Sequence, residues 1–340
     1  MNTIQEIPEL ISKAIEKYNF VKWSNEDDCL ELYADNHTLS SMRKCEGYFV
    51  ESILNRLAFG SGRAWFLDFG IWTHACVEHM YTLIKKNGHC SCPELVDFGA
   101  ILWNKMEIDK YHGQNKNYIK LGRFAGASKL LLDYWRMYGE NRETFKVIGT
   151  ELPFGREKEV YLGEITIRGI RVRCYYSGRI DIIVDDGYSL GVMDTKTTFK
   201  FSGDEITNFN PHEGMQGYVY SLREIVRRNF PDITRPANRV IINHISVGDT
   251  KDYRERFKRT PITYSLEQLN EWKQRQLASF KRLFELAVLD SQEIWNTDSC
   301  SNMFFKDCVY KSLHGVTPSS RESIRKSSYV QIDAWDHYKV

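Results

Sequence analysis

The chain has 340 residues, of which 42% are hydrophobic and 27% are charged, and its formal net charge is +1. This is the composition of an ordinary globular protein, and it excludes a disordered, collagen-like or strongly basic chain. A net charge near zero does not exclude a locally basic cleft, because the field at a surface depends on where the charges lie. Motifs, rather than bulk charge, therefore indicate the function.

The N-terminal segment carries charges throughout and has no apolar run of signal-peptide length. No stretch approaches the roughly 18 apolar residues that are needed to cross a bilayer. We therefore expect a cytoplasmic protein with no membrane partner. In that compartment the 8 cysteines are not expected to form a disulfide framework. They are either packed thiols or metal ligands.

Hydrophobic periodicity predicts the elements in chain order. Residues 1–60 are expected to be helical, with apolar positions at helical spacing over 7–18 and 48–57, and further helices are predicted over 71–84 and 130–138. From about residue 146 to residue 198, β-branched and aromatic residues punctuated by glycine predict a series of strands. The later elements expected are a helix over 213–229, a strand over 240–247 and a long helix over 266–289. Helices, then a sheet, then helices predict an α/β fold with helical additions.

The segment 178–196 contains two strand-like runs on either side of an Asp-Gly turn signal. If Asp185 pairs with Leu190, continuing that register places Asp181 directly opposite Asp194. Cross-strand Cβ atoms in that relation lie about 4.5–5.5 Å apart. Two carboxylates at such a separation repel each other unless a cation lies between them, so the register predicts a cation site.

Lys196 lies two residues beyond Asp194, so the period of two in a strand puts both side chains on one face. A hard divalent cation such as Mg²⁺ or Mn²⁺ prefers carboxylate oxygens, and it can polarise a phosphoryl oxygen and activate a water. A neighbouring ammonium can stabilise charge that develops on a phosphate. The combination predicts hydrolysis of phosphodiester bonds. The alternative reading is a surface hairpin in which aspartate and lysine form an ordinary cross-strand ion pair.

Two segments of this hairpin, Gly178–Asp181 and Met193–Thr198, resemble the core of the PD-(D/E)xK nucleases. The resemblance is to the RecB-like branch, which includes phage exonucleases and iron–sulfur nucleases of the CRISPR-adaptation and AddB types. Three further segments match in the expected order, and they are 70–78, 150–154 and 216–220. The resemblance runs from about Ser41 to His314.

This resemblance implies a restriction-endonuclease-like core, in which a central mixed β-sheet is flanked by helices, with helical N- and C-terminal elaborations. It implies one domain over residues 1–340, with its core at about 41–250. The long helix and the cysteine-bearing tail, 265–340, are expected to fold back on the N-terminal helices.

The resemblance also implies roles for individual residues. His74, on the upstream helix, would join Asp181 and Asp194 as a ligand of Mg²⁺ or Mn²⁺. Glu151 would be the acidic residue on the strand before the hairpin, and Lys196 the catalytic lysine. The activity implied is that of a deoxyribonuclease, in particular an exonuclease, which acts on single-stranded DNA or on duplex ends. Its location would be the bacterial cytoplasm, or the host cytoplasm if the chain is phage-encoded.

Gln216 and Tyr220 match the Q-x-x-x-Y signature of this branch and, being four residues apart, share one helical face. The resemblance implies that they contact the DNA backbone or order the catalytic lysine. Basic residues at two places are further candidates for phosphate contacts. They are Arg223, Arg227 and Arg228 on the same helix, and the arginines of segment 254–259.

A second function remains open, namely a catalytically silent DNA-binding or regulatory protein on the same fold. That reading predicts departures in the catalytic core. Asp181, Asp194 and Lys196 are all present, which favours an enzyme.

Four residues suggest a second metal site. Cys45 occupies the position of the first cluster ligand in iron–sulfur members of the branch, and Cys300, Cys308 and His314 fall where those members have three cysteines. The chain departs from that pattern at His314. Three outcomes are open: a [4Fe-4S] cluster with one histidine ligand, a Cys3His zinc site, or packed thiols without metal. In each case we expect the four side chains to converge.

Overall fold

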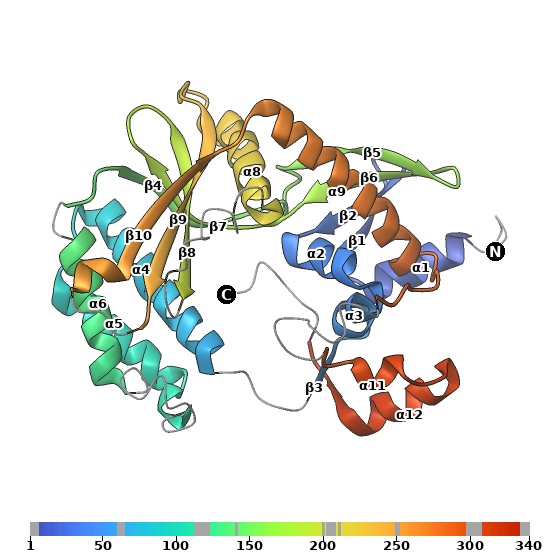
Figure 1. Ribbon diagram of the computed structural model, residues 1–340. Helices are drawn as coiled ribbons and strands as arrows, with labels where there is room; N and C mark the ends of the chain where they lie inside the picture. The colour runs from blue at the N-terminus through green and yellow to red at the C-terminus, as the bar shows by residue number, and fades with distance from the viewer. Residues whose placement is uncertain are drawn as a thin grey trace. The chain divides into compact units, whose positions relative to one another are not determined.

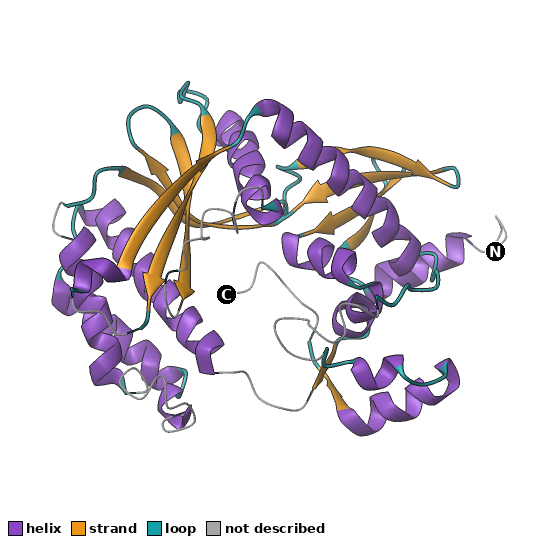
Figure 2. Cartoon of the chain, viewed as in Figure 1, coloured by secondary structure: helices purple, strands orange, loops and turns teal. Residues whose placement is uncertain are grey.

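The computed structural model describes residues 7–59, 65–111, 123–139, 142–198, 201, 209, 212–248, 252–296 and 308–333. The chain forms two compact units (Figures 1 and 2). The first comprises Met1–Ser61, Pro153–Gly178 and Asn270–Val340, and the second comprises Gly62–Leu152 and Arg179–Leu269. None of the described helices is both long and apolar enough to cross a bilayer.

The second unit is built on a five-stranded sheet with the order β10-β9-β8-β7-β4. Its strands are β4 (Lys146–Phe154), β7 (Gly178–Asp185), β8 (Leu190–Thr198), β9 (Ala237–Ser246) and β10 (Phe257–Thr263). β7 runs antiparallel to β8, β8 parallel to β9, and β9 antiparallel to β10. The expected central mixed sheet is therefore confirmed.

Helices cover both faces of this sheet. On one face, α4 (Trp65–Asn87), α5 (Cys92–Lys105) and α6 (Phe124–Tyr138) share a hydrophobic core with the sheet (Figure 1). The other face of β8 and β9 packs against α8 (Glu213–Asn229). Two short 3-10 helices, Ile108–Tyr111 and Tyr253–Arg256, complete the described helical elements of the unit. Because helices cover both faces, β9 is buried along nearly its whole length, although half of its residues are polar.

The first unit holds a four-stranded sheet with the order β1-β2-β6-β5. Its strands are β1 (Val21–Ser24), β2 (Cys29–Ala34), β6 (Ile170–Tyr176) and β5 (Tyr161–Ile167). A second, two-stranded sheet pairs β3 (Leu57–Phe59) with β11 (Tyr329–Gln331). The helices are α1 (Ile7–Lys17), α2 (Asn36–Lys44), α3 (Glu46–Phe49), the π-helix Val50–Leu54, α9 (Leu266–Ala287), α11 (Lys311–His314) and α12 (Pro318–Ser328).

One sequence-based expectation about local structure is wrong, and one strand was not predicted. Residues 21–34 form β1 and β2 rather than a helix, and the charged segment after residue 251 leads into strand β10. β2 depends on a partner distant in sequence, because it pairs with β6, whereas β10 pairs with the preceding strand β9. The strands predicted over 146–198 are present, but they are divided between the two larger sheets.

The register predicted for the hairpin is confirmed. Asp185 pairs with Leu190, and the pairing continues without a shift to Ile182 and Met193. Asp181 and Asp194 are the next positions along the two strands.

The turn of this hairpin is held by the side chain of Asp186. Its carboxylate accepts hydrogen bonds from the backbone N–H groups of Tyr188 (3.0 Å) and Ser189 (2.8 Å), and it forms an ion pair with Arg239 of β9. Gly187 has a φ of 88°, a conformation that favours glycine. Burial opposes ionisation of Asp186, but Arg239 and the two N–H groups lower its pKa to about 2.

We expect Asp186→Asn to destabilise the fold by on the order of 1–2 kcal/mol at neutral pH. The folded pKa lies below the unfolded value, which is about 3.9. The stabilisation is therefore fully present above pH 4 and is lost as the pH falls towards 2. Urea unfolding of both proteins at a series of pH values measures this, and a difference that does not shrink on acidification would contradict it.

Candidate active site

Three side chains from three elements of the second unit converge beside its sheet. His74 comes from α4, Glu151 from β4 and Asp181 from β7. The Nε2 atom of His74 lies 2.7 Å from Oδ2 of Asp181, and the potential ligand atoms of all three residues lie within 4.8 Å of one another. One imidazole nitrogen and two carboxylate oxygens at that spacing form a donor set suited to a divalent cation.

Asp194 and Lys196 lie beside this group on β8. The Nζ atom of Lys196 is 2.9 Å from Oδ1 and 2.7 Å from Oδ2 of Asp194. The Asp194 side chain is 1% exposed, whereas that of Lys196 is 42% exposed, so the lysine reaches from a buried carboxylate towards solvent. The three clustered potential ligands are thus His74, Asp181 and Glu151, whereas the sequence had suggested Asp194 as the third. The carboxylate of Asp194 instead forms an ion pair with Lys196.

The site concentrates negative charge, and its pKa shifts reflect this. Burial raises the pKa of Asp194, and the neighbouring Asp181 raises it further against the effect of Lys196. Burial also raises the pKa of Glu151, to about 7. Burial alone would lower the pKa of His74, but the carboxylates, Asp181 first among them, outweigh it and raise that pKa to about 9. The balance of charge favours a bound cation.

Two residues of the site were not among the sequence candidates. Glu78 lies one helical turn after His74 on α4, and its negative charge raises the pKa of Glu151. Arg179 forms an ion pair with Glu151. The spacing of four residues from His74 was a signal for Glu78. Arg179 gave no such signal, because its role depends on the pairing of β7 with β4.

Glu151 has an unusual backbone conformation. Its φ is 46°, in the left-handed region that a residue with a Cβ rarely adopts. Strain of this kind is generally found where the surrounding structure imposes it, often at functional sites. Here it accompanies the placement of the Glu151 carboxylate beside His74 and Asp181.

The strand that carries Asp194 and Lys196 is anchored by the residue between them. The backbone N–H of Thr195 donates to the carboxylate of Asp181. On the opposite face of the sheet, the Thr195 hydroxyl accepts a hydrogen bond from Nδ2 of Asn243 (3.1 Å), which also donates to Tyr134 (2.9 Å). Thr195 thus links the site to the hydrophobic core beneath it.

Arg259 continues this buried network. Its guanidinium lies 2.6 Å from Oε1 of Glu143, donates to the Tyr81 hydroxyl at 2.6 Å and lies 3.6 Å from the ring centroid of Tyr138. The expectation that Arg259 contacts phosphate is therefore wrong. It is a core residue, because its side chain crosses to the face covered by α4 and α6.

Gln216 and Tyr220 both lie on α8, which packs against β8 and β9. Gln216 is buried and Tyr220 is half-buried, and burial raises the pKa of Tyr220 to about 12. Their proposed contact with DNA or with Lys196 stays a prediction.

The first unit brings together two of the four residues expected in the second metal site. Cys45 and Cys308 belong to one buried cluster with Tyr310, Leu313 and Tyr329. The Sγ atom of Cys45 accepts hydrogen bonds from the backbone N–H groups of Tyr48 (3.5 Å) and Asn296 (3.4 Å). Cys300 lies outside the described residues.

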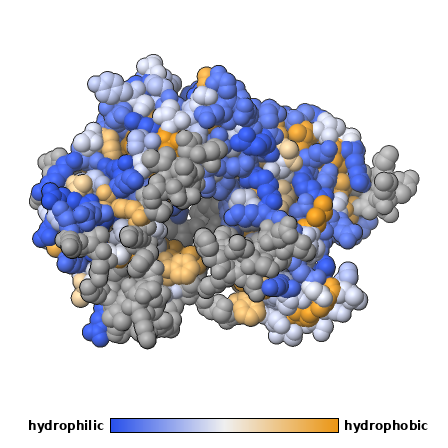
Figure 3. Space-filling model, in the orientation of Figure 1, coloured by the Kyte–Doolittle hydropathy of each residue, from blue (hydrophilic) through white to orange (hydrophobic). Residues whose placement is uncertain are grey.

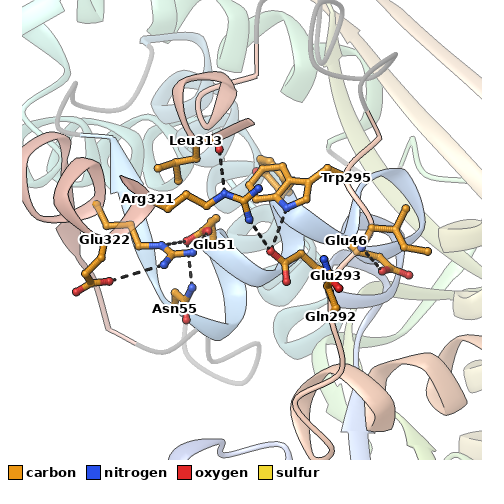
Figure 4. Close-up of polar contacts among 12 residues, drawn as sticks. Glu46, Glu51, Asn55, Gln292, Glu293, Trp295, Leu313, Arg321 and Glu322 are labelled. Atoms are coloured by element: carbon orange, nitrogen blue, oxygen red, sulfur yellow. Dashed lines mark hydrogen bonds and ion pairs between the residues drawn. The ribbon is translucent and has the colours of Figure 1, made fainter. Parts of the chain in front are cut away.

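His314 lies next to this cluster. Its ring is 3.7 Å from that of Trp295, which packs against the cluster. Burial and the nearby Arg321 lower the pKa of His314 to about 4, so its imidazole is neutral at neutral pH. Arg321 also lies over the Trp295 ring and donates to the Leu313 carbonyl (Figure 4).

Ion pairs hold the C-terminal segment of the first unit against its N-terminal helices (Figure 4). Arg282 of α9 is 2.6 Å from Glu46, the residue after Cys45. Arg325 of α12 is paired with the fully buried Glu51, whose carboxylate also accepts from Asn55 at 3.0 Å. These contacts keep the surroundings of Cys45 and Cys308 closed.

The sequence over residues 39–313 matches the family described as the PD-(D/E)XK nuclease superfamily. No curated protein matches the chain.

The Thr195–Asn243 network generates a prediction. We expect Asn243→Leu to lower the free energy of unfolding by about 1–3 kcal/mol, because the hydroxyls of Thr195 and Tyr134 would lose a buried partner. Chemical denaturation measures the change. Ile245→Val, on the same strand and face, is the control for altered packing. If Asn243→Leu and the wild type have the same free energy of unfolding, the hydrogen bonds of Asn243 do not stabilise the fold.

Proposed function

Since the chain belongs to the PD-(D/E)XK nuclease superfamily, a family of metal-dependent hydrolytic nucleases, we propose that it is a deoxyribonuclease that uses Mg²⁺ or Mn²⁺. One observation carries the proposal. The group of His74, Glu151 and Asp181 lies beside the paired Asp194 and Lys196. This places a cation-binding donor set next to a cationic side chain that reaches solvent.

The residues present fit a hard divalent cation. Carboxylate oxygens are its preferred protein ligands, and few protein ligands leave positions for water and substrate. His74, Asp181 and Glu151 would hold the ion, with Asp194 as a further carboxylate of the site. The chemistry that such an ion supplies when bound is polarisation of a phosphoryl oxygen and a lower pKa for a coordinated water.

The chain itself contributes alignment and charge. Asp194 holds the Lys196 ammonium through both carboxylate oxygens, which fixes where the positive charge lies. A phosphate at the site would meet this ammonium, which can orient the attacking water and stabilise charge on the phosphoryl oxygens. Thr195 keeps Asp181 and the Asp194–Lys196 pair in one rigid unit through its backbone N–H.

The finer assignment rests on the sequence resemblance to the RecB-like branch. It supports an exonuclease that acts on single-stranded DNA or duplex ends in the cytoplasm. In this assignment, Gln216 and Tyr220 of α8 contact the DNA backbone or order Lys196. The runner-up function is a catalytically silent DNA-binding or regulatory protein. The acidic residues and the lysine are in place, and this favours the enzyme.

We further propose that Cys45, Cys300, Cys308 and His314 bind a [4Fe-4S] cluster or a zinc ion. Cys45 and Cys308 share one buried cluster, and His314 packs beside it. The two N–H groups that donate to the Cys45 sulfur would stabilise it as a thiolate ligand.

The nuclease proposal predicts a divalent-dependent loss of end-labelled linear DNA and resistance of covalently closed DNA. Chelator and Asp194→Asn are each expected to abolish cleavage. Lys196→Ala is expected to lower kcat by about 10²-fold with little change in DNA affinity, because the ammonium acts on the transition state. Lys13→Ala, an exposed lysine of α1, is the control. Cleavage that persists in excess chelator or in Asp194→Asn would contradict the proposal.

The proposed second metal site predicts that protein purified without oxygen contains either iron and sulfide or one zinc ion per chain. Cys45→Ser is expected to lose the metal and to unfold at a lower temperature. Cys174→Ser, a buried thiol on β6, is the matched control. A wild-type chain that contains neither iron nor zinc would refute this second metal site. A Cys45→Ser variant with unchanged metal content would refute it as well.

A further inference from the structure

The first two turns of α4 expose an unusual amount of apolar surface. Phe66 is 54% exposed, Leu67 50% and Ile71 47%. The rest of the helix buries its large apolar side chains in the core of the second unit, among them Phe69 and Trp72. The visible surface of the protein is mainly hydrophilic, with apolar side chains in small separate groups (Figure 3). Three large apolar residues within six positions are therefore a local feature of this helix end.

This surface is continuous with the candidate metal site. Leu67, Ile71, His74 and Glu78 follow one another at intervals of four, three and four residues, so they lie along one face of α4. Along this face, exposure falls from Leu67 and Ile71 to the half-buried His74 and Glu78. At a rise of 1.5 Å per residue, Ile71 and Leu67 lie about 4.5 Å and about 10 Å along the axis from His74.

The proposed reaction determines what can lie on this apolar stripe, defined here as Leu67 and Ile71 with Phe66 at its border. A scissile phosphate placed at His74 brings its flanking nucleotides within this distance. The apolar parts of a nucleic acid are the base faces and the sugar rings, and in a duplex the base faces are covered by stacking. Aliphatic side chains gain from contact with a base only when that base is unstacked.

We propose that the apolar stripe binds the unstacked nucleotides that flank the scissile phosphate, and so selects single-stranded or frayed DNA. This rests on the proposed nuclease function and adds to it a surface that contacts the unstacked nucleotides of the substrate. A contact of this kind does not depend on base identity, because it involves no hydrogen bonds to base edges.

The test uses two single-stranded oligonucleotides that carry the same phosphates. One has ordinary bases, and the other has abasic nucleotides through its terminal segments. The wild type is expected to cleave the ordinary strand about tenfold faster than the abasic one, in kcat/KM. Leu67→Ser/Ile71→Ser is expected to cleave both strands at the rate at which the wild type cleaves the abasic strand. The conservative pair Leu67→Ile/Ile71→Leu is expected to restore the preference.

The control is Ile101→Ser, which removes a still more exposed apolar residue (69%) from the neighbouring α5 and should keep the preference for the ordinary strand. Thermal unfolding of the serine variants confirms that they fold. If Leu67→Ser/Ile71→Ser lowers kcat/KM equally on both strands, or on neither, the apolar stripe does not bind bases, while the nuclease function stands. A wild type that cleaves neither strand with Mg²⁺ or Mn²⁺ would overturn both proposals.

Discussion

The structure of the second unit depends on holding several carboxylates together where they repel one another. Asp181 and Asp194 lie on adjacent strands, and Glu151 and Glu78 lie beside them. Such a group is stable only if cations compensate for it. The chain supplies Lys196, His74 and Arg179 as partners. Burial first, and the charge of Glu78 second, raise the pKa of Glu151 to about 7, so a further positive charge beside Glu151 would favour its ionised form.

The scaffold explains how this arrangement is maintained. β8 and β9 are buried on both faces, and the parallel pairing between them brings Asn243 next to Thr195. The network of Asn243, Tyr134 and Thr195 fixes the strand from the side opposite to the site. Strained backbone at Glu151 is tolerated because the neighbouring elements determine its position. The packed core thus supports a group of mutually repelling carboxylates at the site.

The parts of the site that depend on local pairing could be predicted from the sequence. The Asp-Gly turn fixes the register of the hairpin, and the register fixes the relation of Asp181 to Asp194. The place of His74 followed only from the resemblance to known nucleases, because nothing local indicates that α4 meets β7. Other parts of the site could be found only once β4 was known to lie at the edge of the sheet, next to β7. These are the place of Glu151 in the group of three and the contributions of Glu78 and Arg179. Strand β2 was missed for the same reason, since it pairs with β6, a segment distant in sequence.

The central claim is that His74, Glu151 and Asp181 surround a divalent cation. A crystal grown with Mn²⁺ tests it most directly, because the ion gives an anomalous difference signal at its own position. The account predicts one strong peak among the imidazole of His74 and the carboxylates of Glu151 and Asp181, which is absent from crystals of Asp181→Asn. A peak elsewhere in the chain, or three side chains bonded to one another with no ion between them at saturating Mn²⁺, would contradict it.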